Sequence, residues 1–288
     1  MADQLTPTSA LRTTMQSSAG PLAALVAYPP GVADAPMLLL VPGYTGSKED
    51  FAPLLDPLVA QGFAVMAVDQ PGQYESPGPD TEAAYTPAAL GLVLASVIRR
   101  LAADRPVLLV GHSFGGLVGR EAVLAGAPVT GLVLLCSGPA AFSSGNRFDA
   151  LTSGAPVLRA RGVQALYDGG QTAAGLDPQD PNPLQQFFRR RFLASSPAGL
   201  LGMGGSLLTE PDHTLDLAAA RSAGGIPVAV IAGEADDAWP LQEQRRMAES
   251  LGTELLLVPG GAHSPAVEAP DQLLAILIPV LRQWLSAD

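Results

Sequence analysis

Short, fully apolar runs recur along this chain, separated by longer segments in which apolar and polar residues alternate with a helical period. Runs of about five apolar residues predict strands that are buried on both faces of a sheet. These runs lie at 37–41, 63–68, 107–110, 129–135, 227–231 and 254–258. A further run at 22–28 is predicted to pair with the segment around 12–16 as a hairpin. The pattern therefore predicts a sheet of about eight strands.

Helices are predicted between the strands, at 50–61, 87–103, 116–125, 241–251 and 270–286. The second of them carries leucine, valine and isoleucine at helical spacing. Ser47 is a suitable N-cap for the first, with Asp50 three positions later. Strands that alternate with helices are typical of an α/β fold, a mostly parallel twisted sheet with helices on both faces. In such sheets, ligands bind at the carboxyl ends of the strands.

The alternation stops between 139 and 223, where no convincing core strand occurs. This stretch contains turns rich in glycine and proline, such as 175–183, and short helical pieces, such as 184–193. It is far too long for a simple connection within a compact domain. We therefore expect a core domain formed by 1–138 and 224–288, and a helical cap or lid inserted as residues 139–223.

The sequence Gly-His-Ser-Phe-Gly at 111–115 joins a predicted strand to a predicted helix. A serine at such a corner has strained backbone angles and projects its hydroxyl above the sheet. Glycine two positions before and after it leaves room for neighbouring backbone. The helix directs free N–H groups and the positive end of its dipole towards the hydroxyl. The five residues alone arise easily by chance, but their place between strand and helix predicts that Ser113 is a nucleophile.

A serine hydroxyl needs a neighbouring base to act as a nucleophile near neutrality, and the chain contains three histidines. His112 immediately precedes Ser113, so its side chain is expected to point away from the serine. His213 lies in the expected cap, where a place at the start of a helix accounts for it without catalysis. His263 follows the last predicted strand in a glycine-rich loop, from which it can reach the carboxyl edge of the sheet. His263 is therefore the predicted base.

The base in turn needs an anion that fixes its tautomer and stabilises its charged form. Three carboxylates follow the strand at 227–231, namely Glu234, Asp236 and Asp237. Asp237 fits equally well as a cap of the next helix. Another strand end where an acid can stand, at 137–141, contains no carboxylate. The acid is therefore expected in the cluster around 236, which gives the order serine, acid, histidine that one specific fold uses.

Attack on a carbonyl creates an oxyanion, which needs two preorganised N–H donors. The backbone N–H of Phe114 is one candidate, because it follows the serine at the start of the helix. The loop at 42–47, Pro-Gly-Tyr-Thr-Gly-Ser, is the expected source of the other. Its glycines allow the backbone to approach closely, although an ordinary strand-to-helix turn accounts for the same loop.

These motifs together resemble the α/β-hydrolase fold superfamily over about residues 10–286. The resemblance rests on the segments 43–44, 69–76, 111–115, 233–236 and 261–263. Two departures are visible: many members carry histidine where this chain has Pro42, and Tyr74 replaces the second glycine of a loop characteristic of the superfamily. Tyr74 is expected near the mouth of the pocket.

The resemblance implies a role for each candidate residue. Ser113 is the nucleophile, His263 the base, and Asp236 the acid, since the acid of this superfamily stands three residues after the glycine at the strand end. The backbone N–H groups of Tyr44 and Phe114 form the oxyanion hole. Relatives that displace halide or open epoxides use an aspartate nucleophile, so the serine argues against both activities.

Charge and composition narrow the expected partners. The formal net charge is −11 and Lys48 is the only lysine, so an acidic surface is expected to repel nucleic acid and anionic membranes. No segment resembles a signal peptide or is apolar enough to span a bilayer, which favours a cytoplasmic location. The single cysteine, Cys136, lies in an apolar run and is expected to be an inert core thiol.

The expected function is that of a serine hydrolase which cleaves a small, apolar carboxylic ester through an acyl-enzyme, with no cofactor and no metal. The same residues also support hydrolysis of a C–C bond, a thioester or a lactone, and cofactor-free peroxidation, because a fold does not determine a reaction. A non-catalytic ligand-binding protein on the same fold is a further alternative. Labelling by a fluorophosphonate distinguishes that alternative from an enzyme.

The expected cap is rich in large apolar side chains. They are Phe187, Phe188, Phe192, Leu193, Leu200, Leu201, Met203, Leu207 and Leu208. Most of them are expected to form the small core of the cap and a few to line an apolar pocket. Three consecutive arginines at 189–191 either meet an anionic substrate or form a solvated helix face; consecutive helix positions cannot all face one site.

Overall fold

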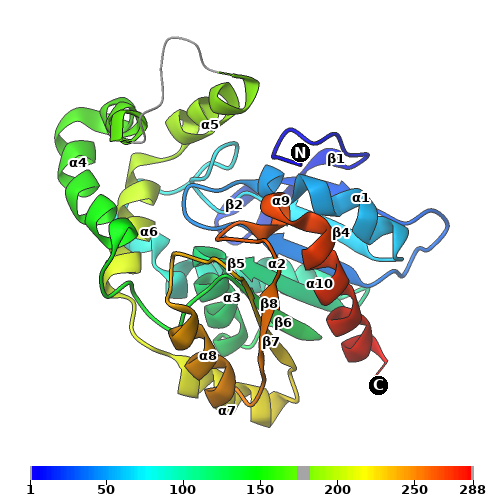
Figure 1. The fold of residues 1–288 in the computed structure, drawn as a ribbon. Coiled ribbons are helices and arrows are strands. Elements are labelled where there is room, and N and C mark those ends of the chain that lie inside the picture. The colour runs from blue at the N-terminus through cyan, green and yellow to red at the C-terminus, as the bar shows by residue number, and fades with distance from the viewer. Residues whose placement is uncertain (1, 174–181, 287–288) are drawn as a thin grey trace.

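The structure is a computed structural model that describes residues 2–173 and 182–286 (Figure 1). The turns expected at 175–183 therefore lie almost entirely outside the described residues. No helix within the described ranges is both long enough and apolar enough to cross a membrane.

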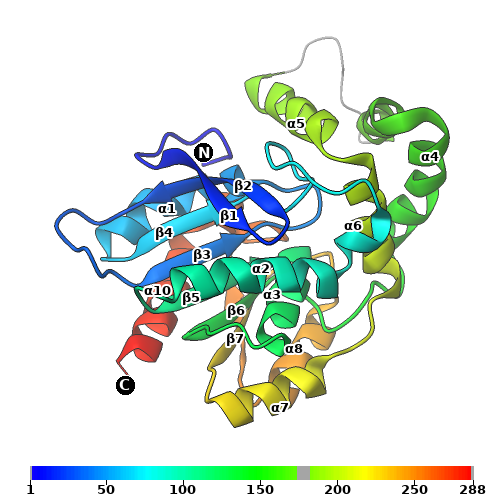
Figure 2. The same ribbon diagram turned by 180° about the vertical axis from the view of Figure 1, so that it is seen from behind.

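An eight-stranded sheet forms the centre of the molecule (Figure 1 and Figure 2). Its strands are β1 (Leu11–Ser17), β2 (Gly20–Ala27), β3 (Met37–Val41), β4 (Ala64–Val68), β5 (Val107–His112), β6 (Gly131–Leu135), β7 (Val228–Gly233) and β8 (Leu255–Val258). Across the sheet their order is β1-β2-β4-β3-β5-β6-β7-β8. The predicted hairpin β1–β2 is antiparallel, as is the pair β2–β4, and all other pairs are parallel. The predicted α/β fold with a mostly parallel sheet is confirmed.

Helices cover both faces of this sheet. On one face lie α1 (Ala52–Ala60), α9 (Pro265–Glu268) and α10 (Pro270–Leu285), and on the other α2 (Pro87–Leu101), α3 (Phe114–Leu124), α7 (Thr214–Gly224) and α8 (Leu241–Ser250). Side chains of a strand alternate between the faces, so Leu38 and Leu40 of β3 pack towards the first group and Leu39 and Val41 towards the second. Two short 3₁₀ helices, η1 (Lys48–Phe51) and η2 (Glu82–Tyr85), join the core elements.

Three further helices lie together beyond one end of the sheet, at the upper left of Figure 1. They are α4 (Asn146–Ala173), α5 (Pro183–Ala194) and α6 (Pro197–Thr209). The helical path of α4 is interrupted at Gly162, whose φ of +80° is outside the helical region. The last helix of the expected cap, α7, packs against α3 and α8 of the core instead. The division of the chain at 139 and 223 into core and cap stays a prediction.

The parallel strands bring distant loops to one edge of the sheet. Strands β3, β5, β7 and β8 all point the same way, and their last residues are Val41, His112, Gly233 and Val258. Parallel strands end at the same edge, so the loops that follow them meet there. This edge carries every candidate catalytic residue.

Candidate active site

Ser113 stands at the corner between β5 and α3. Its φ of +54° and ψ of −121° are strained for a residue with a side chain, as the sequence predicts. The helix begins at Phe114, two residues before the predicted start, because the corner itself contains no intervening loop. A Cβ atom at Gly115 would lie 2.4 Å from the carbonyl oxygen of Val41. Only glycine therefore lets the first turn of α3 approach β3, and the N-terminus of the helix comes to lie beside the serine.

The structure brings Ser113, His263 and Asp236 together. The Nε2 atom of His263 lies 3.0 Å from Ser113 Oγ, and its Nδ1 atom lies 2.8 Å from Asp236 Oδ1. Burial by itself raises the pKa of the Asp236 carboxyl, but hydrogen bonds from His263, Ala238 and Gln244 outweigh burial and hold this pKa below its ordinary value. An ionised carboxylate only accepts hydrogen bonds. Nδ1 of His263 therefore carries the proton, and Nε2 presents its lone pair to the serine hydroxyl.

The second oxygen of Asp236 is held as well. Gln244 of α8 is completely buried, and its Nε2 donates to Asp236 Oδ2 at 2.9 Å. The same amide nitrogen donates to the carbonyl oxygen of Trp239 at 3.1 Å. These bonds orient the carboxylate and leave its Oδ1 for His263 and the N–H of Ala238.

The loop after β3 passes directly over the serine. A Cβ atom at Gly43 would lie 2.9 Å from Ser113 Cβ, so a side chain at this position is excluded. Within the described part of the chain, the backbone N–H groups of Tyr44 and Phe114 donate to no other group. Two free donors beside Ser113 are the arrangement that an oxyanion requires.

Two glutamines hold this loop in place. Gln73 Nε2 donates to the carbonyl oxygen of Gly43 at 2.8 Å, and Gln70 Nε2 donates to that of Pro42 at 2.9 Å. The carbonyl of Gly43 and the N–H of Tyr44 belong to one planar peptide group and point in opposite directions. The N–H of Gly46 donates to the same carbonyl at 3.0 Å, so Gln73 and Gly46 together fix the direction of the Tyr44 N–H.

His112 occupies a different place from the one expected. It falls on the same face of β5 as Val110, beneath the loop that carries His263, and it lines the catalytic pocket together with Ser113. Its Nε2 lies 2.7 Å from the backbone carbonyl oxygen of His263. A carbonyl only accepts, so His112 donates from Nε2. Burial, and then the neighbouring His263, lower the pKa of His112 to about 4, so the ring is neutral near neutrality.

The remaining candidates lie outside this constellation. Asp237 is exposed and accepts from Arg147 Nη2 at 2.6 Å, so it does not cap α8. Glu234 is exposed and accepts from the N–H of Gly260. His213 precedes α7 and contacts Asp216, as its expected place at a helix start implies. Cys136 is buried, and burial is the main reason that the pKa of its thiol is raised.

Three groups of side chains in the described residues come close enough to share a metal ion. Two of them include His263, whose two ring nitrogens already contact Asp236 and Ser113. The third combines Glu121, Glu210 and His213, and Arg120 binds both of its glutamates. Each of the three groups thus contains residues that already bind protein partners.

A cavity of about 410 Å³ lies over Ser113. The core supplies one wall of it and the helices α4, α5 and α6 supply the other. Its lining includes Tyr44, His112, Ser113 and His263 from the core, and Arg147, Leu151, Phe188, Arg191 and Leu207 from these helices. Their side chains thus complete the pocket in which a substrate would meet the serine.

Of the three consecutive arginines, only Arg191 lines this pocket. Its side chain is 12% exposed, and Nη1 donates to Asp50 Oδ1 at 2.6 Å. Arg189 is exposed and donates to Gln164. Arg189 thus lies on the solvated face, as one of the two alternatives has it, and Arg191 lies at the pocket, where Asp50 balances its charge; that an arginine meets an anionic substrate stays a prediction.

More of the large apolar side chains of α5 and α6 line cavities than the sequence predicts. Phe188 and Leu207 line the catalytic pocket, while Phe192, Leu200, Leu201 and Leu208 line a second cavity. More of them thus line cavities than the expected few, although Leu200 and Leu207 are also buried.

The loop at 69–76 holds the only lysine of the chain. Lys48 is 1% exposed, and its Nζ lies 2.9 Å from Asp69 Oδ2 and 2.7 Å from Glu75 Oε2. Tyr74 was expected at the pocket mouth, but its ring packs on Phe187 and beside the Lys48 ammonium, and it lines neither cavity. Its positive φ of +38° turns the side chain towards α5.

The sequence did not reveal the residues that position Asp236 and the loop at 42–47. Gln70 and Gln73 act through hydrogen bonds to a loop about thirty residues earlier in the chain, and Gln244 acts through hydrogen bonds within its own segment. Glutamine has no spacing pattern that reveals such a bond. The one available signal is the place of Gln70 and Gln73 in the segment whose resemblance to a superfamily loop is visible.

Known proteins share the sequence pattern and the fold of this chain. The sequence model described as "Alpha/beta hydrolase family" matches residues 38–276. No curated protein matches the chain significantly. Many solved structures share the fold.

One such structure comes from a study of carboxylesterases of the thaumarchaeon Nitrososphaera gargenis, with 20% identity, a TM-score of 0.74 and coverage of 96% of this chain and 100% of that one. A mutant of the N-acyl homoserine lactonase AidH, complexed with N-hexanoyl homoserine, has 21% identity, a TM-score of 0.73 and coverage of 97% and 99%. A hydrolase from Pseudomonas aeruginosa has 25% identity, a TM-score of 0.72 and coverage of 97% and 100%.

Proposed function

The chain belongs to the alpha/beta hydrolase family, and on this premise we propose that it is a serine hydrolase that cleaves a carboxylic ester through an acyl-enzyme. The observation that carries the proposal is the continuous chain of hydrogen bonds from Ser113 Oγ through His263 to Asp236, with distances of 3.0 Å and 2.8 Å. A hydroxyl, a base and an orienting acid in contact are what an activated serine nucleophile needs.

In the first half of the proposed reaction, Ser113 Oγ attacks the ester carbonyl carbon while His263 Nε2 takes the hydroxyl proton. Asp236 stabilises the imidazolium that forms. The oxyanion accepts hydrogen bonds from the N–H groups of Tyr44 and Phe114, and the positive end of the α3 dipole adds to this stabilisation. The C–O bond to the alcohol then breaks, and His263 returns its proton to the leaving alkoxide.

In the second half, a water molecule attacks the acyl carbon while His263 Nε2 takes one of its protons. The same two N–H groups stabilise the second oxyanion. Collapse of this intermediate breaks the bond to Ser113 Oγ, which regains the proton from His263. The products are a carboxylic acid and an alcohol, and no cofactor enters the sequence of steps.

Labelling with a fluorophosphonate, followed by peptide mass spectrometry, tests the nucleophile. We expect the wild-type protein to carry the phosphonyl group on Ser113 and the Ser113→Ala variant to stay unlabelled. Equal labelling of both proteins, or none of either, contradicts an activated serine and favours a ligand-binding protein.

A substrate panel tests the bond that is cleaved. p-Nitrophenyl esters, acyl thioesters and N-acyl homoserine lactones are offered to the wild-type protein and to Ser113→Ala. We expect the esters to have the highest kcat/KM, and hydrolysis of every substrate to depend on Ser113. A preference for thioesters or lactones would replace the ester proposal with that activity.

A further inference from the structure

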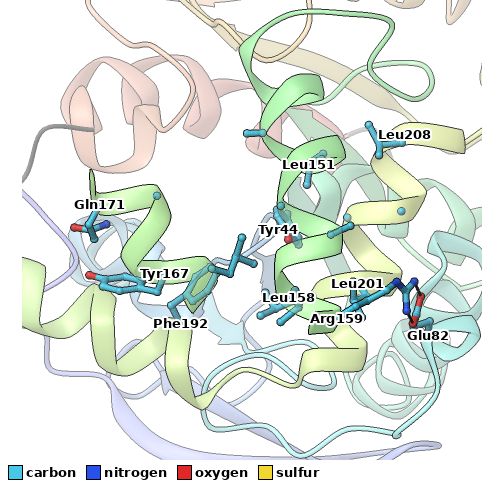
Figure 3. Close-up of a pocket in the computed structure, with 18 residues that line it drawn as sticks. Tyr44, Glu82, Leu151, Leu158, Arg159, Tyr167, Gln171, Phe192, Leu201 and Leu208 are labelled. Atoms are coloured by element: carbon cyan, nitrogen blue, oxygen red, sulfur yellow. Dashed lines mark hydrogen bonds and ion pairs between the residues drawn. The ribbon is translucent and has the colours of Figure 1, made fainter. Parts of the chain in front are cut away.

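A second cavity of about 360 Å³ lies among α4, α5 and α6. Figure 3 shows its walls, with Leu158 and Tyr167 from α4, Phe192 from α5 and Leu201 from α6 around one space. We call it the side chamber. Most of its lining is aliphatic or aromatic, and its volume falls within the range of small-molecule sites.

The side chamber and the catalytic pocket share a wall. Tyr44, Ala150 and Leu151 line both cavities. Tyr44 therefore has two faces in this structure: its backbone N–H lies beside Ser113, and its ring borders the side chamber. Burial raises the pKa of its phenol above the ordinary value, so the hydroxyl stays neutral.

The charges of the side chamber cancel. Its ionisable lining groups that carry charge near neutrality are Arg159 and Glu82, which bind each other through both guanidinium nitrogens at one end of the chamber (Figure 3). A charged tail would have no opposite charge free to meet it there. The chamber thus suits an uncharged, apolar group.

We propose that the side chamber binds the apolar chain of the substrate's acyl group, and that this protein prefers esters of medium-length linear acids over acetates. This inference rests on the proposed ester hydrolysis. At about 30 Å³ for a water-sized group, the chamber holds about twelve such groups, which is enough for a chain of medium length.

Geometry assigns the chamber to the acyl chain and not to the alcohol. The leaving oxygen must lie close to His263 Nε2, which returns the proton to it. His263 lines the catalytic pocket and not the side chamber. The shared wall lies on the side of the oxyanion loop, at Tyr44, so the substituent that points away from His263 reaches the chamber.

Three glycines offer a matched test. Gly170 of α4 and Gly205 of α6 line the side chamber, and a Cβ atom added to either meets no atom within 4 Å. Gly169 of α4 has the same open surroundings but does not line the chamber. Gly170→Leu and Gly205→Leu therefore reduce the chamber from two walls, and Gly169→Leu is the control with the same added side chain.

The measurement is kcat/KM for p-nitrophenyl acetate, butanoate, octanoate and dodecanoate. Loss of each buried methylene lowers binding by a factor of about four. We therefore expect Gly170→Leu and Gly205→Leu to lower the ratio of octanoate to acetate hydrolysis by about tenfold or more. Gly169→Leu is expected to change that ratio by less than about twofold. An unchanged ratio in both chamber variants, with acetate hydrolysis intact, overturns the proposal.

Two further measurements separate the possible failures. n-Octyl acetate places the chain on the alcohol, and a selective loss of its hydrolysis in the chamber variants would overturn the acyl assignment. Calorimetric titration with 1-octanol needs no catalysis. We expect binding to the wild-type protein and weaker binding to Gly170→Leu. If no ester is cleaved, the proposed function fails, and this titration alone decides whether the chamber accepts a chain.

Discussion

The Nε2 atom of His263 lies 3.0 Å from the Oγ atom of Ser113, although the two residues stand 150 positions apart in the chain. Their strands are not neighbours, because β6 and β7 lie between β5 and β8. The loop of His263 must therefore cross the end of β7. A Cβ atom at Gly233 would lie 1.9 Å from the carbonyl oxygen of Ala262, so glycine at the end of β7 is what lets the loop pass.

Replacing Asp236 should lower kcat, whereas replacing the neighbouring Asp237 should not. In Asp236→Asn, the amide cannot stabilise the imidazolium, and its NH₂ group favours the wrong tautomer of His263. We expect kcat for p-nitrophenyl butanoate to fall by about 10³–10⁴. Asp237→Asn is the matched control, because Asp237 is exposed and pairs with Arg147, and its kcat should stay within about twofold of wild type. Similar losses in both variants would contradict the assignment of Asp236.

Gln73 should act on catalysis through the oxyanion loop. Gln73→Glu keeps the size of the side chain but replaces one of the two donors to the Gly43 carbonyl with an acceptor, so the Gly46 N–H alone holds the peptide group that directs the Tyr44 N–H. Loss of one oxyanion donor costs about 10²–10³ in kcat, and we expect a misdirected donor to cost about tenfold to a hundredfold with KM little changed. Gln61→Glu, on the surface beside Arg282, controls for the added charge. A rise in KM at unchanged kcat would indicate a substrate-binding role instead.

His112 should make stability depend on pH. Its pKa in the fold is about 4, against 6.5 for the free side chain. Below about pH 6.5 His112 binds a proton in the unfolded chain but not in the folded one. Its contribution to the free energy of unfolding is therefore complete above this pH and falls as the pH drops towards 4. At about 1.4 kcal/mol per pKa unit, the loss is on the order of 3 kcal/mol.

The variant His112→Gln tests this loss. It keeps an N–H donor for the carbonyl of His263 but has no group that titrates. Urea unfolding at neutral pH and at about pH 4.5 should show that the stability of wild type falls more steeply than that of the variant. Parallel pH profiles would mean that folding does not lower the pKa of His112.

Lys48 should be a major determinant of stability. Lys48→Met leaves the buried carboxylate of Asp69 without its counter-charge, and removal of one partner from a buried pair costs about 3–5 kcal/mol. Arg12→Gln is the comparison, because Arg12 meets Glu49 and Glu75 from a side chain that is 62% exposed, and surface pairs contribute less than about 1 kcal/mol. Chemical unfolding measures both, and an equal effect would show that Lys48 is solvated in solution.

Local sequence was sufficient for the elements and for the order of the candidate residues. Strands such as β3, β4 and β6 are buried on both faces, so they contain no polar residue and are recognised in the sequence as continuous apolar runs. Parallel strands share one carboxyl edge, and this rule together with the Gly-His-Ser-Phe-Gly corner directed attention to Ser113, His263 and the acid cluster around 236, while the resemblance selected Asp236. The catalytic roles of these residues stay predictions, but their contact is a feature of the structure.

The sequence by itself thus determined the α/β fold, the strained corner at Ser113 and the short list of partners, because each depends on neighbours in the chain. Tertiary structure decided the features that depend on single hydrogen bonds or on packing: Gln73 donates to the Gly43 carbonyl, His112 donates to the loop of His263, and α4, α5 and α6 leave a side chamber next to Tyr44. Such contacts join segments that are far apart in the chain, and no local pattern of residue types encodes the distance between them.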